Sequence, residues 1–94
     1  MNAPRRVARA RTKRDAIRAI YAAVEAPKWA ATNLDGLADV LRDLSWLPEG
    51  PVILEWSVPT AAPAADARAL RTVLDQAIAD SAGSRRPLQL RIRR

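Results

Sequence analysis

Apolar residues recur with helical spacing in three stretches of the chain, and this pattern predicts three helices that each bury one stripe. The first runs from residue 13 to about residue 26, where Pro27 ends it. The second begins after Asn33, a good N-cap. The third lies within about residues 65–81, and Gly83 closes it. The stripes consist of Ile17, Ile20, Tyr21 and Val24 in the first helix, Leu34, Leu37, Val40, Leu41 and Leu44 in the second, and Leu70, Val73, Leu74, Ala77 and Ile78 in the third.

Short segments of another kind predict strands. Residues 52–56 form a β-rich run between turn residues, which is typical of a buried strand. Residues 88–93 alternate strictly between apolar and polar, which is typical of a half-buried strand. Its apolar side has Leu88, Leu90 and Ile92, and its polar side has Gln89, Arg91 and Arg93. A weaker alternation over residues 7–11 predicts a first strand.

The predicted elements follow one another as strand, helix, helix, strand, helix, strand. Helices between successive strands argue for an α/β domain with a small parallel sheet. The 94 residues fit one such domain with one thin core. Parallel sheets are usually covered on both faces, but the outer strands carry Arg at alternate positions. We therefore expect one face of the sheet to be open to water and basic.

The composition excludes most catalytic chemistry. The chain has no His and no Cys, which removes the commonest general base, the thiol nucleophile, disulfides and the usual zinc ligands. A carboxylate-only mechanism or a magnesium site stays formally open as a minor alternative. A core this thin leaves little room for a deep cofactor cleft, whereas a surface that fits into another protein's cleft costs the fold little. We therefore expect a binding protein with no cofactor and no metal.

The absence of long apolar segments from the sequence bears on the location of the protein. No apolar run approaches the roughly 20 residues that span a bilayer, and the N-terminal region lacks the apolar core of a signal peptide. We expect a cytoplasmic monomer without membrane contact. Residues 1–14, which lack acids and are rich in Arg and Ala, have a faint likeness to a transit peptide, but helical periodicity begins directly behind them.

The formal net charge of +6 is distributed unevenly along the chain. Residues 1–14 carry six basic side chains, residues 85–94 carry five, and neither end has an acid. Residues 15–84 contain all ten acids and only five bases, a net charge of −5. The positive total alone would suggest nucleic acid as the partner, but the segment that holds most of the fold is acidic.

Three acids line the second predicted helix opposite its apolar stripe. Asp35, Asp39 and Asp43 stand at i, i+4 and i+8. Like charges at i, i+4 destabilise a helix by about 0.2–0.5 kcal/mol per pair, and only Arg42 is close enough on this helix to offset that. Local stability therefore does not explain the arrangement. The structural alternatives are that Asp35 serves the positive end of the helix dipole, and that Asp39 belongs to a solvated face in contact with Arg42.

Two neighbours of these acids allow a functional and a structural interpretation. Gly36, which costs a helix about 1 kcal/mol relative to Ala, indicates either close approach of a partner or tight packing of the helix start. Trp29, in the loop before the cap, is either an exposed interface anchor or a lid on the core. Trp46 and Trp56 are expected in the core.

These residues resemble the barstar family, the intracellular inhibitors of secreted guanyl-preferring ribonucleases. The similar elements are Pro27 with Trp29, the run Asn33-Leu34-Asp35-Gly36-Leu37 with Asp39 and Leu41, and then Val52-Ile53-Leu54-Glu55-Trp56. They cover roughly residues 15–57, and the last helix and strand extend a less specific match through Ile92. The combination of the Asn-Leu-Asp block with Leu-Glu-Trp at this distance carries the resemblance.

The resemblance implies a single barstar-like domain over residues 1–94, with a basic segment 1–14 and a three-stranded parallel sheet. It implies an inhibitor, immunity protein or antitoxin whose loop and second helix cover the active site of a ribonuclease or related toxin. Asp39 would occupy the pocket for a substrate phosphate. The candidate partner-binding residues are Trp29, Asn33, Asp35, Gly36, Asp39 and Asp43.

Three positions depart from the usual family pattern. Ala30 and Ala31 stand where a second aromatic residue and a Gly are typical, and Ala38 stands where Trp is frequent. Much of the stacking surface is therefore absent, which concerns the identity of the partner more than the fold.

The arginines of the two ends support a competing function. Arg9, Arg11, Arg91 and Arg93 would form one patch for nucleic acid if the terminal strands were neighbours. No aromatic residues are interleaved with them, as they are in proteins that bind single strands. The ordinary alternative is a solvated, solubilising face.

Overall fold

The computed structural model describes residues 3–93, and its elements follow the predicted order. They are β1 (Arg5–Arg6), α1 (Lys13–Ala23), α2 (Leu34–Asp43), β2 (Val52–Trp56), α3 (Ala64–Ser81) and β3 (Leu88–Ile92). The predicted α/β class is confirmed.

The strands form one parallel sheet in the order β1-β2-β3. Leu54 of β2 lies opposite Arg5 on one side and Leu90 on the other, while Glu55 lies opposite Arg6 and Arg91. Because side chains alternate along a strand, these two rows point to opposite faces of the sheet. The row that contains Leu54 points toward the helices.

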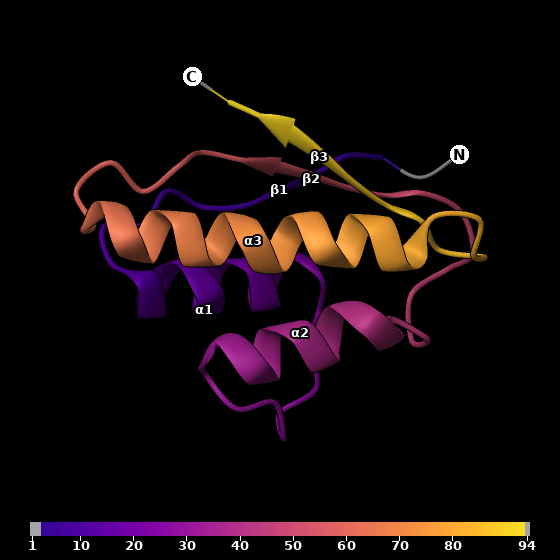
Figure 1. Ribbon diagram of the computed structural model, residues 1–94. Coiled ribbons are helices and arrows are strands. Elements are labelled where there is room, and N and C mark those ends of the chain that lie inside the picture. Colours follow the sequence, from indigo (N-terminus) through magenta and orange to yellow (C-terminus); the bar gives the residue numbers. More distant parts are fainter. Residues whose placement is uncertain (1–2, 94) are drawn as a thin grey trace.

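All three described helices lie on the same side of the sheet (Figure 1). The sheet contributes Val52, Leu54 and Trp56 to the core, and the helices supply their predicted apolar stripes, with Ile17, Ile20, Leu37, Leu41, Leu70 and Leu74 fully buried. The other face of the sheet is not covered by a helix (Figure 1). Arg6 and Arg91 are exposed there, so the expectation of an open, basic face is confirmed.

The first strand differs from the prediction. The structure places it at Arg5–Arg6, whereas the weak alternation predicted residues 7–11. Val7 is buried, and its amide still donates a hydrogen bond to the backbone carbonyl of Glu55. Residues 8–11 have no strand structure and lead into α1. The alternation of Ala with Arg in this segment holds too little apolar surface to fix a register.

The ends of two helices also refine the prediction. The first helix was expected to reach about residue 26, but α1 ends at Ala23 because Glu25 takes a left-handed conformation with φ of 55°. Gly83, with φ of 80°, follows α3 as expected, since a glycine adopts this backbone without strain. Within residues 3–93, none of the helices combines the length and the apolar character that crossing a lipid bilayer requires.

Candidate functional site

Helix α2 presents its carboxylates to solvent because its other side is held in the core. Asn33 begins the helix: its side-chain oxygen accepts a hydrogen bond from the amide of Gly36 at 2.7 Å, as predicted for an N-cap. Leu37, Val40 and Leu41 are buried, which fixes the rotation of the helix about its axis. The three aspartates predicted on the opposite side, Asp35, Asp39 and Asp43, are all exposed.

These acids are accessible, although one of them has a cationic neighbour. Among the described residues, no side chain forms an ion pair with Asp35 or Asp43. Asp39 lies 3.6 Å from the guanidinium of Arg42, and its side chain remains 66% exposed. An exposed pair at this separation is weak, so Arg42 does not withdraw the carboxylate of Asp39 from solvent.

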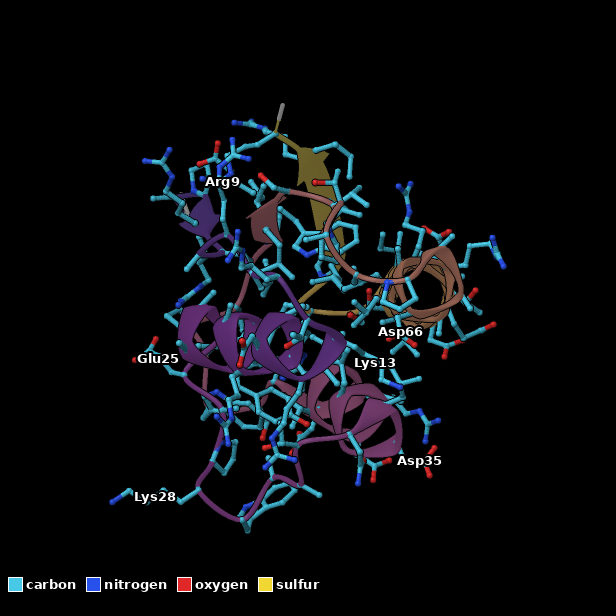
Figure 2. The ribbon with its side chains drawn as sticks, turned by 90° about the vertical axis from the view of Figure 1, so that its left-hand side faces the viewer. Arg9, Lys13, Glu25, Lys28, Asp35 and Asp66 are labelled. Atoms are coloured by element: carbon cyan, nitrogen blue, oxygen red, sulfur yellow. The ribbon has the colours of Figure 1, made fainter. Side chains whose placement is uncertain are left out.

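The loop between α1 and α2 projects Trp29 into solvent. Its side chain is 69% exposed, so the interpretation of Trp29 as a lid on the core is wrong. The loop with Lys28 and the start of α2 with Asp35 lie together at the end of the molecule farthest from the sheet (Figure 2). The other two tryptophans serve the core as expected: Trp56 is buried, and Trp46 packs against the core and donates its indole N–H to the carbonyl of Val24.

The carbonyl of Ala31 fixes the position of the loop on α2. It accepts a hydrogen bond from the hydroxyl of Tyr21 at 2.6 Å and another from the amide of Asn33 at 3.0 Å. A Cβ atom on Gly36 would lie 2.1 Å from this carbonyl oxygen and 2.9 Å from the Tyr21 hydroxyl. Tight packing of the helix start therefore explains the buried Gly36, and close approach of a partner is not needed to explain it.

The environment of the Tyr21 hydroxyl disfavours its ionisation. Burial raises the pKa of Tyr21 above its ordinary value, and the nearby carboxylate of Asp39 raises it further. The hydroxyl, which is protonated at neutral pH in any tyrosine, donates to the carbonyl of Ala31.

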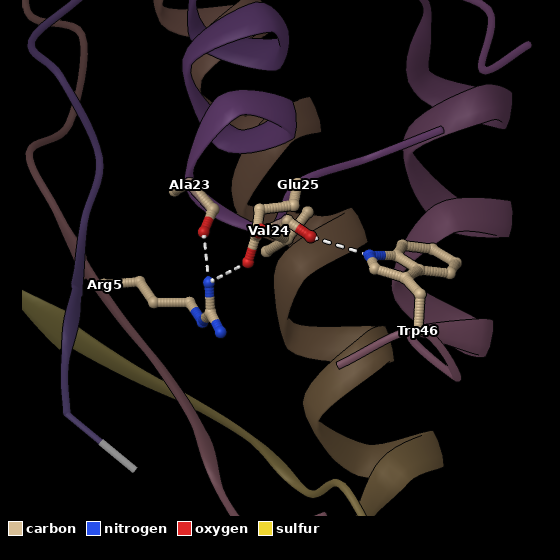
Figure 3. Close-up of polar contacts among 5 residues, drawn as sticks. All are labelled: Arg5, Ala23, Val24, Glu25 and Trp46. Carbon is tan, nitrogen blue, oxygen red and sulfur yellow. Dashed lines mark hydrogen bonds and ion pairs between the residues drawn. The ribbon is translucent and has the colours of Figure 1, made fainter. Parts of the chain in front are cut away.

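The start of the loop is anchored at the end of α1 (Figure 3). The guanidinium of Arg5 donates to the carbonyl of Ala23 and to the carboxylate of Glu25, each at 3.0 Å. From the other side, the indole N–H of Trp46 donates to the carbonyl of Val24 at 2.8 Å. Carbonyls that a helix end leaves unsatisfied thus gain partners from β1 and from the segment after α2. Both ends of the loop that carries Trp29 are consequently fixed.

The family of the chain follows from comparison with known proteins. Residues 4–93 match Barstar (barnase inhibitor), which is nearly the whole chain. The chain belongs to the barstar family. Comparison with curated proteins and with solved structures gives no significant match. The resemblance expected from the sequence is confirmed, and the barstar family is a family of ribonuclease inhibitors, not of enzymes.

In this barstar-family chain the predicted residues are grouped unevenly. Trp29, Asn33, Asp35 and Asp39 belong to the loop and the first two turns of α2. Asp43 is the last residue of α2, about 12 Å along the helix axis from Asp35. It lines a surface pocket of about 500 Å³ whose other charged residues include Arg42, Arg85 and Arg86. Asp43 is thus at the periphery of the group.

The structure adds residues that sequence reasoning missed. Tyr21 was expected only in the apolar stripe, and neither Arg5 nor the backbone of Ala31 was a candidate. The phenol group of Tyr21 was a signal, because a half-buried tyrosine needs a partner for its hydroxyl. Nothing in the local pattern indicated which partner that would be.

The terminal strands are not neighbours, since β2 lies between β1 and β3. The arginines at the two ends therefore stand on both sides of β2, and the condition under which Arg9, Arg11, Arg91 and Arg93 were expected to form one patch is not met.

Proposed function

We propose that this chain inhibits a ribonuclease or related toxin by covering its active site with α2 and the loop before it. The observation that carries the proposal is the outward orientation of Asp35 and Asp39 on a helix whose other face is fixed in the core. Membership of the barstar family supports an inhibitor role, and the carboxylates supply a mechanism for it.

The mechanism is competition with the RNA backbone. A ribonuclease active site must be cationic to hold phosphates, so its Arg and Lys side chains also attract carboxylates. Asp39 enters the pocket that would receive a substrate phosphate. Asp35 lies one turn away on the same face and contacts a second cationic group. Because the helix is rigid, little ordering entropy is lost when the two carboxylates bind.

Trp29 and Asn33 complete the contact surface. The exposed indole of Trp29 offers a large, rigid area with few rotatable bonds, which suits an interface anchor. Asn33 uses its side-chain oxygen to cap α2, and its NH₂ group stays available for the partner. Gly36 acts behind this surface, because its missing side chain allows the loop to sit against α2.

A variant pair on matched aspartates tests the proposal. Asp39 and Asp75 are both exposed helical residues that pair with an arginine on their own helix, and Asp75 lies on α3. We expect Asp39→Asn to weaken inhibition of a secreted guanyl-preferring ribonuclease by about thirtyfold or more, equivalent to about 2 kcal/mol, because a buried charge pair is lost. Asp75→Asn should leave inhibition unchanged.

The measurement is the inhibition constant in an RNA cleavage assay, with thermal melting of each variant as the check on folding. Equal inhibition by Asp39→Asn and the unmodified chain would remove the proposed mechanism. Inhibition that depends equally on Asp75 would indicate only a general effect of net charge.

A further inference from the structure

The open face of the sheet and the carboxyl ends of its strands hold a second charged surface, which we call the arginine face and define by Arg6, Arg9, Arg11, Arg91 and Arg93. On this face Arg6, Glu55 and Arg91 stand side by side on β1, β2 and β3. Neighbouring strands are about 4.8 Å apart, so the two arginines flank Glu55 with about 10 Å between their Cα atoms. Glu55 is the one acidic residue within the three described strands.

Three guanidinium groups of this surface are available to an outside ligand. Arg6, Arg11 and Arg91 are exposed, and within residues 3–93 their side chains have no hydrogen-bond or ion-pair partner. Arg5 of the same strand differs, because its side chain points toward the helices and is paired with Glu25. Of the two arginines of β1, only Arg6 therefore contributes an unpaired charge to the open face.

The carboxyl ends of the strands extend the same surface. The amide of Arg93 donates to the carbonyl of Trp56 at 2.8 Å, and its guanidinium reaches across the end of β2 to the carbonyl of Val7. Beside it lies a shallow pocket of about 240 Å³, lined by Arg9, Arg11, Ser57, Thr60 and neighbouring residues. In open parallel sheets, ligands bind preferentially at the carboxyl ends of the strands.

We propose that the arginine face binds the phosphate backbone of a nucleic-acid duplex. Closely spaced arginines with a single acid among them complement a polyanion. The chain's four aromatic residues lie elsewhere. Trp56 is buried in the core, and Trp29 is in the loop before α2. The side chains of Tyr21 and Trp46 donate hydrogen bonds to the carbonyls of Ala31 and Val24. The face therefore offers nothing on which bases could stack, which favours a duplex over a single strand. Contacts to phosphates alone carry no sequence preference.

This surface is separate from the proposed inhibitory one. Arg9 lies at the sheet end of the molecule, whereas Asp35 lies at the opposite end beyond the helices (Figure 2). The two surfaces can consequently be occupied at the same time, and the binding of a duplex does not depend on the proposed inhibition of a nuclease.

The experiment measures binding of the full chain to a 5′-labelled RNA duplex of about 20 base pairs, and to a DNA duplex of the same sequence, at several salt concentrations. With about four phosphates neutralised, the affinity should fall roughly a hundredfold between about 50 and 200 mM salt. We expect both duplexes and a scrambled sequence to bind with similar affinity. The double variant Arg6→Ala/Arg91→Ala should lower the slope of log K against log salt by about two.

Two further variants test the location of the site. Arg18→Ala/Arg68→Ala removes the same charge from exposed positions on α1 and α3 and should keep most of the affinity. Glu55→Gln removes the acid between Arg6 and Arg91 and should strengthen binding several-fold. Melting curves of all variants establish that each is folded.

Several results would overturn the proposal. These are no binding of either duplex at about 50 mM salt, tighter binding of a single strand than of the duplex, and equal losses in the two double-arginine variants. The variant Asp35→Ala/Asp39→Ala separates the two proposals, because it should lose nuclease inhibition and keep duplex binding.

Discussion

The hydroxyl of Tyr21 donates a hydrogen bond to the carbonyl of Ala31 at 2.6 Å, which joins α1 to the loop that carries Trp29. The same carbonyl lies against Gly36, where a side chain would collide with it. The exposed, partner-facing residues thus depend on a small contact behind them. Contacts that hold a binding loop in place before the partner arrives reduce the conformational entropy that the loop loses on association.

Tyr21→Phe should loosen the loop while leaving the fold intact. The Ala31 carbonyl keeps the Asn33 amide as a partner, so we expect a loss of stability of only about 1 kcal/mol. Amide hydrogen exchange over residues 28–32 should accelerate, and nuclease inhibition should weaken with it. Unchanged exchange in this segment would show that the hydroxyl does not order the loop.

Gly36→Ala should destabilise the protein, against the ordinary preference of helices. Ala is favoured over Gly inside a helix by about 1 kcal/mol, but here the new Cβ would lie 2.1 Å from the Ala31 oxygen. Either the loop or the start of α2 must move. Urea unfolding measures the sign directly, and Ala38→Gly in the same helix is the control that should show the ordinary loss.

How far the sequence predicts this molecule depends on how local each feature is. Helix α2 was predicted with its cap, since Asn33 and the spacing of Leu37, Val40 and Leu41 all lie within a few turns. The contact of Tyr21 with Ala31 joins a side chain to a backbone atom ten residues away, which leaves no periodic trace. A strand of two residues likewise has too few positions to show an alternation of apolar and polar residues. The sequence therefore did not predict the strand at Arg5–Arg6.

Arg5 illustrates the same limit in chemical terms. A charged side chain is ordinarily expected to face water. Arg5 is paired with Leu54 in the sheet, however, and its guanidinium points toward the helices, where it donates to a carbonyl at the end of α1. Only the three-dimensional position of Ala23 and Glu25 explains why this charge points toward the helices.

Trp46→Phe tests the other anchor of the loop. The substitution keeps an aromatic ring but removes the donor for the Val24 carbonyl, which Figure 3 shows at the end of α1. Leaving a partly buried carbonyl unpaired should cost about 1–3 kcal/mol. Urea denaturation followed by circular dichroism gives this value. A loss well below 1 kcal/mol would mean that water replaces the indole at this carbonyl.

Alkaline pH should weaken the fold through Tyr21, the chain's one tyrosine. Burial and then Asp39 raise its pKa in the folded state, so the unfolded chain releases the proton more easily. The contribution of Tyr21 to stability is therefore fully present below the ordinary tyrosine pKa of about 10, and is lost as pH rises through the higher folded value. Melting temperatures between about pH 8 and 11 measure this loss.

Tyr21→Phe should remove that part of the pH dependence. Phenolate absorbance titrates this single group directly, and Asp39→Asn should lower the pKa of Tyr21 only in part, because burial is the larger cause. A titration curve that does not respond to Asp39→Asn would show that the carboxylate of Asp39 and the phenol of Tyr21 are not electrostatically coupled.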